Sequence, residues 1–229
     1  MSPALGFRPA AVLFDMDGLL LDSERAFTDC LAQAAQARGH ALPEALWLAM
    51  VGGSDAHSRA LLAAQIGQVE SDAVQDAART RYDALVDSGI DHRPGVVPLL
   101  DWLRSRGIPR AVATSTRNPL ARRKLDAAGL LPYFDAVCTS SDVAQPKPAP
   151  DVYLLAAQRL RVTPAQCLVL EDSSVGVRAA LAAGMTPLQI PDLVAPDAAT
   201  RAFGHCILES LDEAQRLLEA CFEGVPLRA

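Results

Sequence analysis

The sequence predicts an α/β fold: a doubly wound, Rossmann-like parallel sheet that carries an inserted, all-helical domain. Three observations indicate it. Five short apolar runs recur without polar alternation, as strands buried on both faces of a parallel sheet do. Helical patterns separate most of these runs. After the first run, however, one long segment shows helical patterns alone.

The expected strands are too short for amphipathic helices and are rich in Val, Leu, Ala and Cys. Because they do not alternate between apolar and polar residues, we expect helices to cover both faces of their sheet. The predicted strands are Ala11–Phe14, Arg110–Ala113, Ala136–Thr139, Cys167–Leu170 and Thr186–Ile190.

The helices between the later strands carry start and stop signals. Pro98–Arg106 is followed by Gly107, a common helix stop. Serine and asparagine before an apolar stripe predict N-caps, and glycine after it predicts the end. The other signals are Asn118 as N-cap with Pro119 at the first helical position and Gly129 as stop, Ser173 or Ser174 as N-cap of a helix through Ala183 with Gly184 as stop, and Ser210 with Glu213 as a capping box before a helix towards Phe222.

The segment after the first strand reads as three helices. An apolar stripe from Ala26 to Ala35 ends at Gly39, a second helix begins at Ser54 and reaches Ile66, and Glu70–Val86 forms a third. We therefore expect an α/β core domain in residues 1–23 and 92–229, and a helical cap domain in residues 24–91.

Composition limits the possible partners. A chain of 229 residues, half of them hydrophobic, suits a large core with a smaller insert. The net charge of −6 gives no basic footprint for nucleic acid. The one basic run, Arg122–Lys124, is interpreted as a solvated helix face.

Location and assembly are also expectations at this stage. The five cysteines form no C-x-x-C pair and their number is odd, which argues against a disulfide framework and suits the cytoplasm. No signal peptide is expected over Met1–Pro9. No apolar stretch approaches the roughly 18 residues of a membrane span. We expect a cytoplasmic monomer without a membrane partner.

Polar residues gather at the carboxyl ends of the predicted strands, where parallel α/β sheets bind ligands. Asp15 and Asp17 follow the first strand, in a segment whose alternation places them on one side, roughly 7 Å apart. The other residues of this rim are Thr114-Ser115-Thr116 after the second strand, Ser140-Ser141-Asp142 and then Lys147 after the third, and Glu171-Asp172-Ser173-Ser174 after the fourth.

Several carboxylates at one edge repel one another unless a cation lies among them. Oxygen ligands suit Mg²⁺, which takes one or two carboxylates together with substrate phosphate. A carboxylate is also able to act as a nucleophile and form an aspartyl phosphate. A lysine and a hydroxyl suit the oxygens of a transferring phosphoryl group.

Four segments resemble the motifs of the haloacid dehalogenase superfamily, in order and at workable spacing. The resemblance covers the whole core and is closest to the subgroup with a helical cap after the first strand, which includes β-phosphoglucomutase and many sugar-phosphate phosphatases. The segments are "DMDGLLLDSE", "VATSTRN", "QPKPAPDVY" and "VLEDSSVGVRAALAAGM".

The resemblance implies a role for each matching residue. Asp15 would be the nucleophile and Asp17 the general acid and base. Mg²⁺ would be held by Asp15, the backbone carbonyl of Asp17 and Asp172, with Glu171 beside the metal directly or through water. Phosphoryl oxygens would be bound by Thr114 and Lys147, with Ser115 and Asn118 as further phosphate or substrate contacts.

Each motif alone has a plainer interpretation. Asp15 and Asp17 would be solvated acids at a strand end, and Thr114 would cap a turn. Lys147 lies among prolines, as in an extended linker. The pair Glu171-Asp172 would cap the following helix, a role compatible with metal binding.

The cap is expected to set substrate specificity. Residues 51–59 match the loop that dips into the site in this subgroup, so Gly52, Asp55 and His57 are candidate substrate contacts. His57 is alternatively a surface helix residue, and Arg59 a partner of a nearby acid. Two positions depart from the mutase pattern: a histidine is replaced by Phe27, and an arginine by Asp55.

These features predict a Mg²⁺-dependent phosphatase of small phosphorylated metabolites, with sugar or polyol phosphates as substrates and an aspartyl-phosphate intermediate. Three alternatives remain open: a phosphosugar mutase, a dehalogenase in which an aspartate attacks carbon, and a catalytically inactive binding module.

Overall fold

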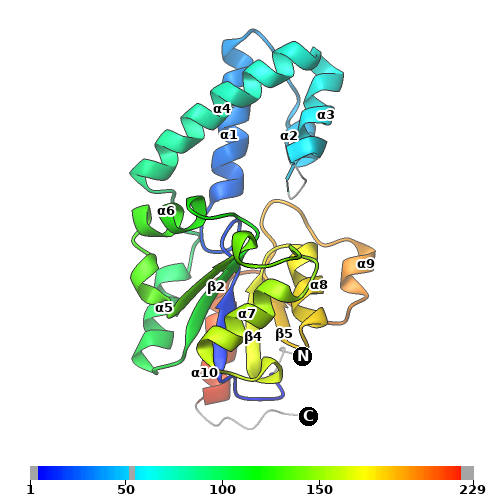
Figure 1. Cartoon of the computed structure of the whole chain (residues 1–229). Coiled ribbons are helices and arrows are strands. Elements are labelled where there is room, and N and C mark those ends of the chain that lie inside the picture. Colours follow the sequence, from blue (N-terminus) through cyan, green and yellow to red (C-terminus); the bar gives the residue numbers. More distant parts are fainter. Residues whose placement is uncertain (1–4, 52–54, 223–229) are drawn as a thin grey trace.

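The chain folds around a six-stranded parallel sheet with helices on both faces and a helical insert at one end (Figure 1). This computed structural model describes residues 5–51 and 55–222. The predicted α/β class is confirmed. The strand order is β3-β2-β1-β4-β5-β6, so β1 lies at the centre.

Five of the six strands were expected, each within one residue of its observed ends. The sixth has only two residues, within the short apolar stretch Cys206–Leu208 that was not recognised as a strand. It is defined by pairing with its neighbour, at Leu188 with Cys206 and Gln189 with Ile207. The strands are β1 (Ala11–Phe14), β2 (Arg110–Thr114), β3 (Ala136–Thr139), β4 (Cys167–Glu171), β5 (Thr186–Gln189) and β6 (Cys206–Ile207).

Burial on both faces explains why the strands do not alternate in polarity. All four residues of β1 are at most 1% exposed. Val12 and Phe14 belong to one apolar cluster, whereas Ala11 and Leu13 belong to a second cluster on the other face. The central strand is therefore covered on both sides, as its composition predicts.

The helices of the core domain cover the two faces of the sheet. α5, α6 and α10 bury residues in the cluster with Phe14, and α7 and α8 pack in the cluster with Leu13. The core helices are α5 (Val96–Ser105), α6 (Leu120–Ala127), α7 (Asp151–Leu160), α8 (Ser174–Ala182), α9 (Ala198–Arg201) and α10 (Leu211–Phe222), with 3₁₀ turns at Leu131–Tyr133, Ser140–Asp142 and Pro164–Gln166.

The predicted helix caps have mixed outcomes. Ser173 caps α8, because its hydroxyl accepts a hydrogen bond from the Gly176 N–H. The Asn118 cap is wrong: α6 starts after Pro119, and the Asn118 amide donates to Thr139 Oγ1 at 3.3 Å. Half of the Ser210 capping box forms, since the Ser210 hydroxyl accepts from the backbone N–H of Glu213.

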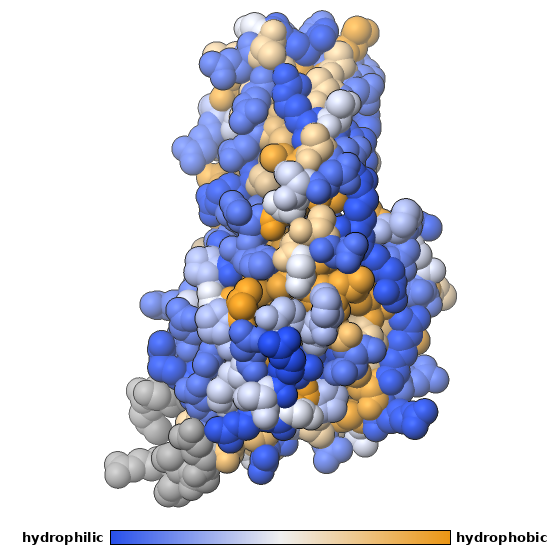
Figure 2. Space-filling view, turned by 90° about the vertical axis from the view of Figure 1, so that its left-hand side faces the viewer, coloured by the Kyte–Doolittle hydropathy of each residue, from blue (hydrophilic) through white to orange (hydrophobic). Residues whose placement is uncertain are grey.

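The helical insert contains α1 (Ser23–Ala37), α2 (Glu44–Leu48), α3 (Asp55–Ile66) and α4 (Gln68–Ser88). The short α2 was not expected. α1 and α4 run side by side and rise beyond one end of the sheet (Figure 1). Their apolar faces meet in an interior that includes Leu31, Leu62 and Val74, each at most 3% exposed. Figure 2 shows this insert as a narrower column, with a largely hydrophilic surface, above the broader core.

Two neighbouring crossings join the insert to the core. The backbone N–H of Asp22 donates to the carbonyl of Asp91 at 2.9 Å, and that of Arg93 donates to the carbonyl of Leu20 at 3.0 Å. Leu21 also forms an isolated bridge with His92. Within the described ranges, every helix is too short or too polar to span a lipid bilayer. All five cysteines are free thiols.

The strand order places the carboxyl ends of β1, β2 and β4 side by side. β1 pairs with β2 on one flank and with β4 on the other, all in parallel. From β1, the strands β2 and β3 follow on one side and β4 to β6 on the other. Open α/β sheets form a crevice for ligands where the strand order changes direction in this way. The chain passes from the core into the insert at this same edge, shortly after β1.

Candidate active site

A cavity of about 560 Å³ lies at this edge of the sheet, beneath the insert. Most residues that sequence analysis assigned to the rim line it. From the core these are Asp15, Asp17, Thr114, Ser115, Thr116, Lys147, Asp172, Ser173, Ser174, Val175, Gln189, Asp192, Leu193, Val194 and Ala195; Glu24 and Val51 come from the insert.

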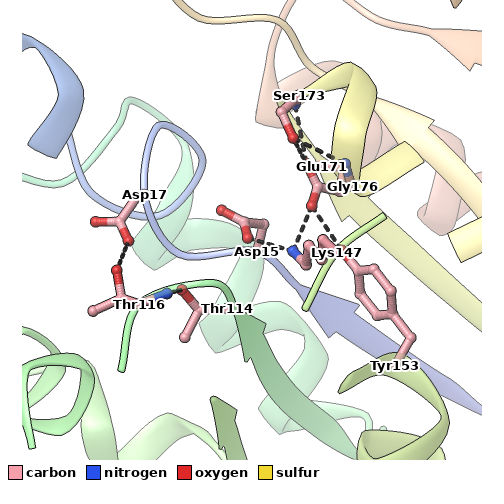
Figure 3. A network of polar contacts seen from close by, with 9 residues as sticks. All are labelled: Asp15, Asp17, Thr114, Thr116, Lys147, Tyr153, Glu171, Ser173 and Gly176. Atoms are coloured by element: carbon pink, nitrogen blue, oxygen red, sulfur yellow. Dashed lines mark hydrogen bonds and ion pairs between the residues drawn. The ribbon is translucent and has the colours of Figure 1, made fainter. Parts of the chain in front are cut away.

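Lys147 lies at the centre of the site. Its Nζ donates to Asp15 Oδ1 and to Glu171 Oε1, both at 2.6 Å (Figure 3). The side chains of Lys147, Asp15 and Glu171 are 3%, 10% and 0% exposed. Buried charges of this kind persist only when they are paired and hydrogen-bonded. The plain-linker interpretation of the segment around Lys147 is therefore wrong.

The Glu171 carboxylate is fully used by protein donors. Besides Lys147, it accepts from the Tyr153 hydroxyl at 2.8 Å, from the Ser173 N–H at 3.0 Å and from the Ser173 hydroxyl at 2.9 Å (Figure 3). Four donors fill about all the acceptor sites of a carboxylate. Glu171 thus fixes Lys147, and little acceptor capacity is left on it for another group.

Three carboxylates converge beside this lysine. Oxygens of Asp15, Glu171 and Asp172 all lie within 4.8 Å of one another. Burial is the main cause that raises the pKa of Asp15 to about 7; Glu171 and Asp17 add to the rise, and Lys147 opposes it. Burial, with Glu171 and Asp15 as neighbours, raises the pKa of Asp172 well above its usual range. One lysine does not balance three acids, so this oxygen-rich group fits a hard divalent cation such as Mg²⁺.

The end of β2 supplies hydroxyl groups to the cavity. Thr114 is 1% exposed, and its Oγ1 accepts from the Thr116 N–H at 3.0 Å. The exposed Ser115 follows it on the cavity wall. The backbone thus turns around the Thr114 side chain, and the hydroxyls of this segment line the cavity that Asp15 also lines.

Asp17 has partners of its own. Its Oδ1 accepts from the Ser23 hydroxyl and from Lys124 Nζ, both at 2.6 Å. Its Oδ2 accepts from the Thr116 hydroxyl at 2.5 Å, the contact that Figure 3 shows. Although burial opposes it, the charge of Lys124 holds the pKa of Asp17 below its usual value. The two acids of the first motif therefore sit in electrostatically different places.

Lys124 was missed by the sequence analysis. The basic run Arg122–Lys124 is not a uniformly solvated face, because Lys124 is 5% exposed on the buried side of α6. Its neighbour Arg123 instead donates to Asp87 of the insert at 2.6 Å. The sequence holds one signal for this: Ala121, Lys124 and Leu125 share the spacing of a buried helical stripe.

Among the residues that it describes, the structure gives no contact between the cavity and the substrate-binding candidates predicted in the insert. Gly52 and the side chain of Asp55 lie outside the described part of the structure. His57 is exposed and does not line the cavity. Arg59 pairs with Asp72 at 3.1 Å, as the alternative interpretation had it. Phe27 packs edge-on against Tyr82 of α4, with ring centroids 5.2 Å apart.

Asn118 also lies away from the cavity walls. Its side chain reaches β3 instead, where it bonds to Thr139. A direct contact between Asn118 and substrate therefore finds no support in this arrangement.

A family model described as haloacid dehalogenase-like hydrolase matches residues 9–184, which include β1 to β4, the insert and α8. The chain belongs to this family. The predicted resemblance is confirmed, and with it the expectation that the protein is a hydrolase. The family match argues against the binding-module alternative, and Asp15, Asp17 and Asp172 of the acid set line one cavity.

Characterised relatives and solved structures agree with this membership. Hexitol phosphatase A of Escherichia coli (strain K12) is 38% identical over 177 residues, 75% of this chain and 78% of that protein. Fructose-1-phosphate phosphatase YqaB of the same strain is 35% identical over 187 residues, 80% and 97% of the two chains. A haloacid dehalogenase family hydrolase from Deinococcus radiodurans R1, solved with bound phosphate and sodium, is 31% identical with a TM-score of 0.81 and covers 99% of this chain and 100% of that one.

Substitution of Gly176 by alanine tests how tightly the Glu171 carboxylate is packed. A Cβ at this position would overlap the Glu171 carboxylate. Because the carboxylate is fixed by four donors, Gly176→Ala should cost about 1–3 kcal/mol of unfolding free energy and lower the Tm by several degrees. The measurement is thermal unfolding followed by circular dichroism.

Gly6→Ala is the matched control for this variant. No heavy atom lies within 4 Å of a Cβ at Gly6, and its φ is not in the left-handed region. Its Tm should equal that of the wild type. Equal Tm values for Gly176→Ala and Gly6→Ala would contradict the tight packing described for Glu171.

Proposed function

We propose that the protein is a Mg²⁺-dependent phosphatase that hydrolyses small phosphorylated metabolites, sugar or polyol phosphates above all, through a phosphoryl group carried on Asp15. One observation carries this proposal: Asp15 faces a shared cavity beside Lys147 and Asp172, while Asp17 lies two residues away with separate partners. The phosphatase names of the two E. coli relatives support the reaction class.

Asp15 is the proposed nucleophile. Attack by one of its oxygens on phosphorus forms an acyl phosphate and expels the alcohol of the substrate. Lys147, Thr114 and Ser115 line the same cavity as Asp15, and their donors would stabilise the charge on the transferring phosphoryl oxygens. Lys147 opposes the rise in the pKa of Asp15 that burial causes, and a bound cation would favour the ionised carboxylate that the attack requires.

Asp17 is the proposed general acid and base. It would give a proton to the leaving alcohol and later take one from the water that hydrolyses the acyl phosphate. A second acid is needed because Asp15 becomes esterified during the reaction. The lowered pKa of Asp17 suits the base role, and the acid role requires Asp17 to take up a proton before the alcohol leaves.

The metal would be held by Asp15, Asp172 and the backbone carbonyl of Asp17. When bound, Mg²⁺ neutralises charge on the phosphate and on the acids around it. Glu171 belongs to the same group of carboxylates, but its four donors favour a role in holding Lys147 over direct ligation.

The helical insert is the proposed cap. We assign residues 24–91 to it and residues 1–23 and 92–229 to the core, with the paired crossings at Asp22 and Asp91 as the connection. An insert above the cavity would exclude water during phosphoryl transfer.

The cavity favours substrates with one phosphate. Among the described residues that line it, Lys147 is the only cation, and it is already paired with two acids. Asp17, Glu24 and Asp192 surround the remaining volume and suit hydroxyl groups better than a second phosphate. The assignments of Gly52, Asp55 and His57 to substrate, the cytoplasmic location and the monomeric state stay predictions from sequence.

Asp15→Asn should abolish phosphate release from sugar phosphates and from nitrophenyl phosphate. Loss of a covalent nucleophile costs on the order of 10⁴-fold or more in kcat. Asp126→Asn is the matched control, an exposed aspartate on α6 outside the cavity, and should keep wild-type activity. Substantial turnover by Asp15→Asn would contradict the mechanism.

Removal of divalent metal should abolish activity, and added Mg²⁺ should restore it. Binding to the folded state alone also raises the Tm as metal is added. We expect this increase in wild type and a much smaller one in Asp172→Asn, measured by thermal unfolding in a metal titration. Full activity in the presence of excess chelator would contradict the proposed cofactor.

A further inference from the structure

Lys124 is a buried cation whose partner belongs to the cavity, although Lys124 itself does not line it. Its Nζ lies 2.6 Å from Asp17 Oδ1, and the side chains of Lys124 and Asp17 are 5% and 18% exposed. A charge-assisted hydrogen bond of this length in a protein interior is directional and strong. Lys124 comes from α6, a helix that supplies no residue to the cavity walls in the described part of the chain.

The three donors around Asp17 come from three different elements. Ser23 is the first residue of α1, Thr116 follows β2, and Lys124 lies on α6. A carboxylate has about four acceptor sites. Three are filled, and the remaining one belongs to a side chain that lines the cavity. Such a set of donors defines one orientation of the carboxylate.

The insert covers Lys124 from above. The Tyr82 ring of α4 has its centroid 5.0 Å from Lys124 Nζ, and Phe27 of α1 packs edge-on against that ring. The aromatic pair keeps water from the ion pair and adds a cation–π contact. Phe27, which stands where the mutase pattern has a histidine, thus packs against the Tyr82 ring that covers Lys124.

We propose that Lys124 is a positioning residue for Asp17: it fixes the Asp17 carboxylate in the orientation from which that acid reaches the leaving alcohol of a substrate in the cavity. The inference rests on the proposed function, in which Asp17 transfers the proton. Without Lys124, the Asp17 carboxyl group keeps only the hydroxyl donors Ser23 and Thr116 and is no longer held by an ion pair. Asp17 would then leave this orientation, and proton transfer to the alcohol would become inefficient.

The test compares two aryl phosphates of similar shape whose leaving groups differ in basicity, phenyl phosphate and nitrophenyl phosphate. The ratio kcat/KM reports events up to departure of the leaving group. A poor leaving group needs the proton, and a good one departs largely without it. Lys124→Met should therefore lower kcat/KM on the order of tenfold or more for phenyl phosphate, and about threefold or less for nitrophenyl phosphate.

Arg123→Met is the matched control. Arg123 lies next to Lys124 on α6 and also contacts the insert, through Asp83 and Asp87, but it does not touch Asp17. Both kcat/KM values should stay near wild type in this variant. An equal loss in Arg123→Met would show that a loosened contact with the insert explains the effect, and would overturn the assignment.

A double-mutant cycle separates positioning from stability. In an Asp17→Asn background, the further change Lys124→Met should have no effect on kcat/KM for either substrate, because Lys124 acts through Asp17. This double variant removes both charges of the pair, so it avoids an unpaired buried charge. A further loss of the same size as in the wild-type background would overturn the proposal.

Lys124→Gln covers the case in which Lys124→Met does not fold. Lys124→Gln keeps a hydrogen-bond donor without the charge. Its kcat/KM for phenyl phosphate should therefore lie between that of the wild type and the tenfold lower value expected for Lys124→Met. Wild-type kinetics in a folded Lys124→Gln or Lys124→Met would overturn the proposal. An active Asp17→Asn would instead overturn the role of Asp17 in the proposed function, so the two failures are distinguishable.

Discussion

The ion pairs of Lys147 are the constraint on which the rest of the site depends. Asp15 directly follows β1 and Glu171 is the last residue of β4, and both are held at 2.6 Å by the ammonium group of Lys147, whose side chain is 3% exposed. Burying these acids without that cation would cost more free energy than the packing around them contributes.

The Glu171 carboxylate is also held by Tyr153 and Ser173, whose hydroxyls donate hydrogen bonds to it. Gly176 has no side chain and so leaves room for this carboxylate. The lysine therefore sets where the proposed nucleophile lies, and one positive charge still leaves Asp172 unbalanced, which is the physical basis for the metal proposed at this edge.

The parallel sheet brings two separate electrostatic environments to one cavity. Asp15 receives Lys147 from the loop after β3, and Asp17 receives Lys124 from α6, the helix between β2 and β3. The pKa of Asp15 is raised, chiefly by burial, whereas that of Asp17 is lowered by its own lysine. Two carboxylates with the same chemistry are thereby given different neighbours, which is a general way to assign different tasks to like residues.

Sequence reasoning succeeds where the determining physics is local. The five apolar runs become strands because each is buried on both faces, and polar residues after them meet at one edge because parallel strands share a direction. Lys147 is found through its motif, although the surrounding prolines alone suggest a linker.

The features that were missed depend on distant partners. Lys124 is buried because Asp17 lies beside it and Tyr82 lies above it, and neither is visible from the run Arg122–Lys124. β6 exists only as a pairing partner of β5. Asn118 has the sequence context of a helix cap, yet its amide bonds to Thr139 of a neighbouring strand.

The most direct test of the account is the chemical identity of the phosphorylated group. The Asp17→Asn variant, in which hydrolysis of the acyl phosphate lacks its proposed base, is mixed with Mg²⁺ and nitrophenyl phosphate, quenched in acid and digested for mass spectrometry. We predict a phosphoryl group on the peptide that contains Asp15, on that aspartate, in an amount that approaches one per protein. Turnover of wild type with no phosphoryl group on Asp15 in either protein, or with the group on another residue, would contradict the account.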